Sequence, residues 1–223
     1  MKKKPLKGIV ILIALLLMQT ACRQSDKEKL AKAVEYEQKG AVYQTENNWD
    51  SAIANYYKSY EWYSLLDVCG QPMHQAKYVS KAAQLAYKLA CCYEMTHNFD
   101  DAAIYAEFSF NYCEKLKQTD SCTADEILIG YYEYKAAQTK INESNVQMSF
   151  YKHGAEFIYP ACRAVDSLGW DKSDNEKRRK MALLCYMAAE SLFYHTGDSA
   201  NEQLYHQKYN DLYFKLTGHL PEN

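Results

Sequence analysis

The chain has 223 residues, with 26 basic and 28 acidic side chains, 21 tyrosines, eight glycines and four prolines. Its formal charge of −2 gives it no electrostatic reason to bind nucleic acid, because such binding depends on clustered positive charge. The low counts of glycine and proline, with no linker rich in either, favour one compact domain over two.

The N-terminal segment has the composition of a signal peptide. Four lysines precede an apolar run over residues 8–18, which is shorter than the about 20 apolar residues that a membrane-spanning helix takes. Thr20 and Ala21, both small, then lead directly into Cys22, after which the sequence turns polar. This ending resembles the lipobox of bacterial lipoproteins, and the resemblance covers residues 1–22 only.

The lipobox resemblance implies that residues 1–21 are removed and that Cys22 is acylated as the first residue of a domain spanning residues 22–223. Gln19 departs from the pattern, and an ordinary cleaved signal peptide or an uncleaved signal anchor is the alternative. Loss of four lysines leaves 22 basic and 28 acidic residues, a formal charge of −6. Because Arg23 and not aspartate follows the cysteine, the sorting rule of bacterial lipoproteins favours the outer membrane and leaves the facing side open.

The rest of the chain is predicted to be all-helical. Apolar residues recur at intervals of three and four, without a convincing strand-like alternation. Breaks in this pattern delimit eight helices of about 18 to 25 residues. Pro160 is expected to kink or divide the sixth helix, because proline lacks the N–H that a helix interior uses. The breaks fall at Asn47-Asn48, Gly70 to Pro72, His97-Asn98, Gln118 to Ser121, Asn142 to Asn145, Gly169 to Lys172 and Gly197-Asp198.

Three segments carry the S/T-x-x-E pattern of a capping box. In this motif the hydroxyl and the carboxylate each accept a hydrogen bond from a backbone N–H that the helix leaves free. The segments begin at Ser25, Thr123 and Ser173, so helix starts are predicted there. Pro72 is expected at the first position of another helix, where its missing N–H is not needed.

Two blocks of the sequence place small and aromatic side chains in the same order. The first block has Gly40, Tyr43, Trp49, Asp50, Ala52, Tyr56 and Ser59. The second, 50 residues later, has Leu89, Ala90, Tyr93, Phe99, Asp100, Ala102 and Ser109. This order resembles the tetratricopeptide repeat, in which a small residue and a tyrosine on one helix precede a turn and an aromatic-Asp-x-Ala start of the next helix.

Two weaker copies complete the pattern, so that four copies begin near residues 33, 83, 129 and 183. The weaker copies align Tyr132, Ala136, Ala155, Tyr186 and Phe193 with the family pattern. Both fail at the alanine of the second helix, where Met148 and Glu202 stand. The spacing exceeds the roughly 34 residues typical of the family, so the signature lies within longer hairpins.

The repeat resemblance implies a right-handed α-solenoid, a stack of about four antiparallel hairpins with about eight helices. Small residues would allow close helix approach, and aromatic rings would fill the gaps between layers. The repeat core would then be Gly40, Tyr43, Trp49, Ala52, Tyr56, Ala90, Tyr93, Phe99 and Ala102. The family binds partners in a concave groove, whose positions carry over to Glu37, Gln44, Tyr87, Glu94, Glu133, Lys140 and Tyr194.

Several tyrosines fall outside the repeat positions. Tyr57 and Tyr60 have no role in the pattern, while Tyr205, Tyr209 and Tyr213 recur every four residues as one stripe on the last helix. We interpret the stripe as part of the core, with an exposed partner surface as the alternative.

Seven cysteines remain after Cys22, an odd number that disulfides cannot pair completely. They are Cys69, Cys91, Cys92, Cys113, Cys122, Cys162 and Cys185. We interpret most of them as small buried side chains in apolar helices. A bridge involving Cys113 and Cys122 is the alternative, because an exported protein can form disulfides.

No pattern of a catalytic or metal-binding site occurs in the sequence. The six histidines form no HExxH motif and have no persuasive ligand at one-turn spacing, and no phosphate-binding or dinucleotide-binding fingerprint is present. Asp100 and Asp101 are attributed to a helix start, where carboxylates interact favourably with the helix dipole. The sequence therefore predicts a non-enzyme without metal or cofactor.

These patterns together predict a membrane-anchored envelope lipoprotein that acts as a non-catalytic scaffold for protein–protein interaction. Its partners would be an unidentified envelope protein and, through the N-terminal lipid, the membrane, but no nucleic acid. The alternative is a carbohydrate-binding lipoprotein associated with glycan uptake. Some glycan-uptake lipoproteins are built on similar helices, and exposed tyrosine or tryptophan can stack on sugar rings.

Overall fold

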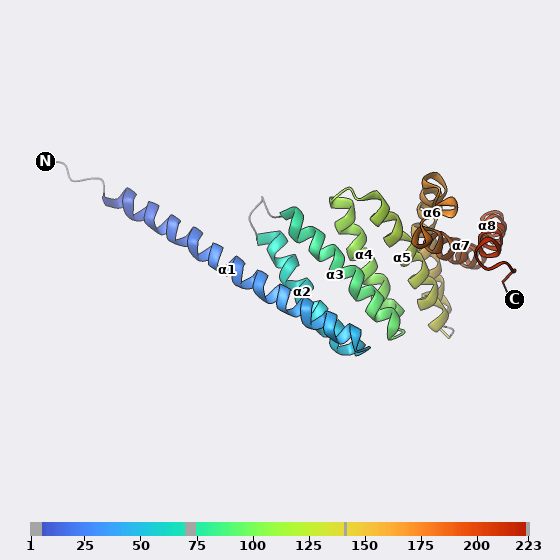
Figure 1. Ribbon diagram of the computed structural model, residues 1–223, viewed down its shortest axis with the longest axis horizontal. Helices are drawn as coiled ribbons and strands as arrows, with labels where there is room; N and C mark the ends of the chain where they lie inside the picture. The colour runs from blue at the N-terminus through green and yellow to red at the C-terminus, as the bar shows by residue number, and fades with distance from the viewer. Residues whose placement is uncertain (1–5, 70–74, 141, 222–223) are drawn as a thin grey trace. The chain divides into compact units, whose positions relative to one another are not determined.

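A computed structural model describes the backbone of residues 6–69, 75–140 and 142–221, and side chains from Asp26 onward except at residues 68, 69, 119 and 120. Within this part of the chain every regular element is a helix, and there is no strand (Figure 1). The helices are α1 (Leu6–Thr45), α2 (Trp49–Cys69), α3 (Gln75–Met95), α4 (Phe99–Lys115), α5 (Thr119–Thr139), α6 (Ser144–Leu168), the 3-10 helix η2 (Trp170–Lys172), α7 (Glu176–Thr196) and α8 (Ser199–Thr217).

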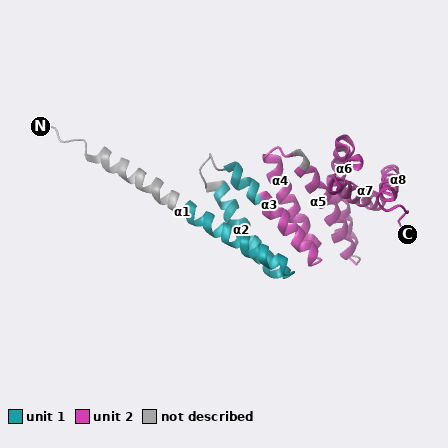
Figure 2. Cartoon of the chain, viewed as in Figure 1, with its two compact units in different colours: residues 1–82 teal, residues 83–223 magenta. Residues whose placement is uncertain are grey.

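The helices divide into two compact units (Figure 2). Unit 1 comprises residues 1–82 and unit 2 comprises residues 83–223, so the division falls within α3. The assignment of residues 22–223 to one domain stays a prediction.

In unit 1, α1 and α2 form an antiparallel hairpin whose turn and packing follow from a few residues. Asn47 adopts a left-handed φ of 56°, which asparagine tolerates, and the Asn48 side chain accepts a hydrogen bond from the Ser51 N–H at 3.2 Å. Gly40 lies against the buried ring of Tyr56, where an added Cβ would be 2.6 Å from Cδ1. Only glycine therefore allows the two helices to approach this closely.

The interior of unit 1 is built mainly from alanine and tyrosine. Ala33 and Ala52 are fully buried, and Tyr63 lies with its ring 6.5 Å from that of Tyr78. The buried Ser59 hydroxyl donates a hydrogen bond to the Ala33 carbonyl at 2.7 Å. This bond offsets the free-energy cost of burying the hydroxyl. The small residues set the helix spacing and the rings fill the remaining volume.

Unit 2 contains the end of α3 and the helices α4 to α8. His97 takes a left-handed φ of 58° in the turn before α4, and the Asn98 side chain accepts from the Asp101 N–H. Gly169, Gly197 and Gly218 have positive φ at the ends of α6, α7 and α8, as glycine commonly does after a helix. The turns predicted at His97-Asn98, Gly169 and Gly197 are confirmed.

A pair of glycines brings α5 and α6 close together in unit 2. A Cβ on Gly130 would lie 2.9 Å from the Ile158 side chain, and a Cβ on Gly154 would lie 2.9 Å from the Glu133 Cβ. The core beside this contact joins α5 to α8 and includes Ile127, Ile158, Cys162, Val165, Trp170, Cys185, Tyr186, Leu192, Phe193 and Tyr205. The all-α fold of eight helices, packed as successive hairpins, is thereby confirmed, and it is compatible with tetratricopeptide-like repeats.

The predicted capping boxes are wrong. Thr123 is buried inside α5, because α4 ends in a tight turn with Lys117 at φ 54° and the next helix already begins at Thr119. Ser173 precedes the true cap of α7, Asn175, whose side chain accepts from the N–H groups of Lys177 and Arg178. Ser25 lies within the continuous α1. A capping pattern identifies side chains that can cap, but the preceding turn decides where the helix starts.

Pro160 does not divide α6, which runs unbroken from Ser144 to Leu168. The start predicted at Pro72 lies outside the described residues, and so do the side chains of the predicted signal peptide, 1–21, of Cys22 and of Cys69. Within the described part of the chain, none of the helices has the length and apolar character that crossing a membrane requires.

Candidate functional site

The two predicted groove residues of unit 1 are engaged within the unit. The Glu37 carboxylate pairs with the Lys81 ammonium at 3.2 Å, and Gln44 Oε1 accepts a hydrogen bond from the Tyr56 hydroxyl at 2.6 Å. The first contact joins α1 to α3 and the second joins α1 to α2, so neighbouring helices hold both side chains in place.

In unit 2 the predicted groove residues occupy different environments. Glu94 accepts a hydrogen bond from the buried Tyr132 hydroxyl at 3.0 Å, and Lys140 pairs with Asp100 at 3.1 Å. Tyr194 is 64% exposed on α7. The pKa of Tyr87 rises to about 12 because its hydroxyl is buried and lies beside the Cys91 thiol. The structure thus brings Glu94 next to α5, while Tyr194 stands apart at the end of α7.

Glu133 differs from the other predicted groove residues because it is only 5% exposed. Its Oε1 forms a hydrogen bond with Nδ1 of His153 at 2.8 Å, and Nε2 of His153 lies 3.7 Å from Oε1 of Glu107. The cluster Glu107–Glu133–His153 therefore joins α4, α5 and α6. Gly154 makes it possible, because a side chain there would push α6 away from Glu133.

The pKa values of Glu133 and His153 are shifted by burial and by their contact with each other. Burial raises the pKa of Glu133 above its ordinary value; the hydrogen bond from His153 opposes this, and the charge of Glu107 adds to it. For His153, burial lowers the pKa, but the hydrogen bond to Glu133 and the charges of Glu133, Glu107 and Glu156 outweigh it, so the pKa is raised. The imidazole is held between two carboxylates of different exposure.

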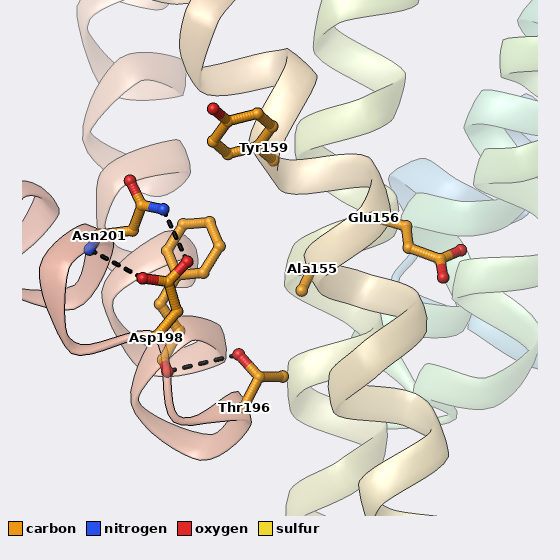
Figure 3. A pocket seen from close by; sticks show the side chains of 7 residues that line it. Ala155, Glu156, Tyr159, Thr196, Asp198 and Asn201 are labelled. Atoms are coloured by element: carbon orange, nitrogen blue, oxygen red, sulfur yellow. Dashed lines mark hydrogen bonds between the residues drawn. The ribbon is translucent and has the colours of Figure 1, made fainter.

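A second polar feature of unit 2 is an open groove of about 560 Å³ between α6, α7 and the start of α8 (Figure 3). It is lined by Ala155, Glu156, Tyr159, Phe193, Thr196, Asp198 and Asn201. The Tyr159 ring meets the Phe193 ring edge-on at 6.3 Å and is 44% exposed. No basic residue lines the groove; the Asp198 carboxylate faces it, whereas the Glu156 carboxylate points away (Figure 3), so the groove favours a positively charged group.

Asp198 caps α8 within this groove. Its carboxylate accepts from the Asn201 side chain at 2.7 Å and from the Asn201 backbone N–H at 3.2 Å, as Figure 3 shows. These two hydrogen bonds hold the pKa of Asp198 below its ordinary value, so the group is ionised at neutral pH.

The tyrosine stripe on α8 is divided between core and surface. Tyr205 is buried and stacks on both Tyr186 and Phe193, at 5.9 Å and 5.7 Å. Tyr209 and Tyr213 are half-buried and tilt toward each other. In unit 1, Tyr57 is 40% exposed, whereas its neighbour Tyr56 is 1% exposed.

The cysteines of the described side chains are all free thiols. Cys113 and Cys122 are not bridged. The two thiols that come closest to a bond are instead the fully buried Cys162 on α6 and Cys185 on α7, whose Sγ atoms lie 3.1 Å apart.

Sequence analysis missed Glu107, His153 and Tyr159. The first two join Glu133 from separate helices, so no local spacing reveals them. Tyr159 could have been suspected only from its place next to Pro160 in α6.

Comparison with known proteins adds no family assignment. Neither a scan against protein-family models nor a search of curated proteins finds a match to this chain. Any function therefore has to rest on the geometry of the site.

Proposed function

We propose that the chain is a non-catalytic interaction module of the bacterial cell envelope, anchored to the outer membrane by a lipid on Cys22. The proposed interaction rests on one observation, the groove between α6, α7 and α8. Its exposed Tyr159 ring, with the Asp198 carboxylate lining the same groove, fits a segment of another envelope protein that presents a lysine or arginine beside an apolar side chain.

The proposed groove is tested by crosslinking in intact cells. A photoreactive amino acid at Tyr159 is expected to capture one dominant partner, and the same probe at Ile104, which is 46% exposed on α4, serves as the control. In the Asp198→Asn background the Tyr159 adduct should fall at least fivefold, because the groove loses its negative charge while asparagine can still cap α8. Equal adducts from both positions, or an adduct insensitive to this loss of charge, would contradict the proposal.

The proposed lipid anchor is tested separately. Cells fed a clickable fatty acid should label the wild-type chain and a Cys122→Ser control, whereas Cys22→Ser should lose the label and leave the membrane fraction. Labelling that survives Cys22→Ser would exclude this anchor without bearing on the groove.

The groove also supports the alternative of carbohydrate binding. An exposed tyrosine ring can stack on a sugar, and Thr196, Asn201 and the Asp198 carboxylate offer hydrogen-bonding groups in the same groove. Glycan-array binding that disappears in Tyr159→Ala and persists in Ile104→Ala would favour this alternative over a protein partner. An array without a signal would eliminate it.

A further inference from the structure

We propose that Glu107, Glu133 and His153 form a binding site for a first-row divalent cation such as Zn²⁺. One ligand atom from each residue, a histidine nitrogen and two carboxylate oxygens, lies within 4.8 Å of the others. Metal–ligand bonds of about 2.0–2.2 Å place neighbouring ligand atoms roughly 3–4 Å apart, so small side-chain adjustments are sufficient. This inference is independent of the lipid anchor and of the α6–α8 groove.

A buried oxygen of Glu133 points independently to a ligand. Oε1 holds His153, but Oε2 is buried and no hydrogen-bond donor among the described residues reaches it. Only 5% of the Glu133 surface is exposed, so water does not solvate this oxygen freely. A buried carboxylate oxygen without a partner is unfavourable, and a cation bound at the cluster would satisfy it.

The surroundings of the cluster favour a cation and leave a route to it. The His153 and Glu107 side chains are 41% and 34% exposed, so an ion can enter from their side while Glu133 closes the other. The carboxylates of Glu156 and Asp100 also act on the cluster, and Asp100 forms an ion pair with Lys140 at 3.1 Å. The local charge is therefore negative without a bound ion.

The imidazole is also held in place before any ion arrives. The Phe157 ring meets His153 edge-on at 5.2 Å, and Phe110 in turn meets Phe157 edge-on at 5.8 Å. Rigid support of this kind lowers the ordering that binding must impose on a ligand side chain. With one imidazole and two carboxylates, the site should select first-row divalent ions over Ca²⁺ and Mg²⁺, which prefer oxygen ligands throughout.

The test uses the full-length chain, extracted in detergent and stripped of metal with a chelator. Isothermal titration with ZnCl₂ should show one equivalent bound, and CoCl₂ should give the visible absorption of a nitrogen- and oxygen-ligated ion. His153→Ala and Glu107→Gln should each weaken Zn²⁺ binding at least tenfold. The matched control is His206→Ala, because His206 also pairs with a glutamate, Glu190 at 2.7 Å, but has no third ligand group beside it among the described residues.

Several results would overturn the site. The proposal fails if the unmodified chain binds no Zn²⁺, if His206→Ala reduces binding as much as His153→Ala, or if CaCl₂ competes equally well. Glu107 is partly exposed, so Glu107→Gln is expected to fold even where His153→Ala does not, and circular dichroism verifies this. Unchanged binding in a folded Glu107→Gln variant would mean that His153 simply bridges two carboxylates and holds no metal.

From a different observation, we infer that Cys162 and Cys185 form a disulfide between α6 and α7; this rests on the proposed export to the envelope. Their Sγ atoms, 3.1 Å apart, are closer than ordinary non-bonded sulfur atoms and need only a small shift to reach bonding distance. Oxidation removes one proton and one electron from each thiol, and an envelope dithiol oxidase accepts them by reduction of its own disulfide to two thiols.

Protein from cells is alkylated without prior reduction and analysed by mass spectrometry. A disulfide-linked peptide pair that contains Cys162 and Cys185 is expected, whereas Cys113 and Cys122 should carry the alkyl label. Free Cys162 and Cys185 in protein that still carries the fatty-acid label would exclude the bridge while leaving the anchor intact. Cys162→Ser should leave Cys185 alkylated, which controls for scrambled pairing.

Discussion

The two units of the molecule apply the same hairpin pattern to different interiors. In unit 1 the only buried polar residue among the described side chains is Ser59, and its hydroxyl is satisfied by the Ala33 carbonyl. Unit 2 buries two carboxylates, Asp125 and Glu133, close to histidine, serine and thiol groups. The hairpin pattern thus sets the distance between helices but not which side chains lie between them. The buried ionisable groups among the described residues are concentrated in unit 2.

The largest expected effect is the loss of a ring from the interior of unit 1. Tyr56→Ala should lower the free energy of unfolding by about 3–5 kcal/mol, because it removes a buried aromatic side chain and leaves a cavity against Gly40. Tyr57→Ala is the adjacent control and should cost about 1 kcal/mol or less, since Tyr57 is 40% exposed. Urea unfolding followed by circular dichroism compares the two, and equal losses would contradict a core built on Tyr56.

The next largest effect is a dependence of stability on pH that is expected in unit 2. Burial raises the pKa of Asp125 from 3.8 to about 7, against hydrogen bonds from Ser109 and Cys113 that lower it. The folded state therefore binds more protons than the unfolded state between these values, and stability falls as pH rises from about 4 to 7. At pH 8, Asp125→Asn should stabilise the chain by on the order of 3–4 kcal/mol, with little effect at pH 4.

Segment-resolved hydrogen exchange at pH 5 and pH 8 checks this prediction. Protection should fall at the higher pH around α4 and α5. The fall should be smaller in Asp125→Asn, with the remainder due to Glu126, whose pKa burial also raises to about 7, and unchanged in the exposed control Asp211→Asn. A stability that rises with pH across this window would show that Asp125 is ionised and stabilised in the folded state.

A smaller effect tests the helix contact that places Glu133 beside His153. Gly154→Ala should destabilise unit 2 by about 1–3 kcal/mol, because the new Cβ would meet the Glu133 Cβ at 2.9 Å and the Leu192 side chain at 3.0 Å. An ordinary glycine in a helix interior gains about 1 kcal/mol on replacement by alanine. A gain of stability for Gly154→Ala in thermal unfolding would therefore contradict the close approach of α5 and α6 at this glycine.

The smallest effect should be the same in both units. Asn48 caps α2 and Asn98 caps α4 through hydrogen bonds of 3.2 Å and 3.3 Å to backbone N–H groups. Each Asn→Ala change should cost about 1 kcal/mol in urea unfolding. A large difference between the two would show that the hairpins are not equivalent at their turns.

The hairpins were predictable because their signals are local. Gly40, Asn47 and Ala52 lie within a few turns of one another in the sequence, so their spacing indicates a close helix contact and a turn. The cluster of Glu107, Glu133 and His153 was not predictable in this way, because its members come from three helices. Family analogy placed Glu133 in an open groove, whereas Gly154 draws α6 over it and buries it.

The proline inside α6 has a consequence for anyone who scans the α6–α8 groove by substitution. Pro160 has no N–H, so the main-chain carbonyl of Glu156, one turn earlier, lacks its usual intrahelical donor. That oxygen belongs to a residue that lines the groove. If a partner segment binds in the proposed groove, a donor on it can pair with this carbonyl, and alanine scanning of Glu156, Tyr159 and their neighbours would leave that hydrogen bond untouched and understate the affinity.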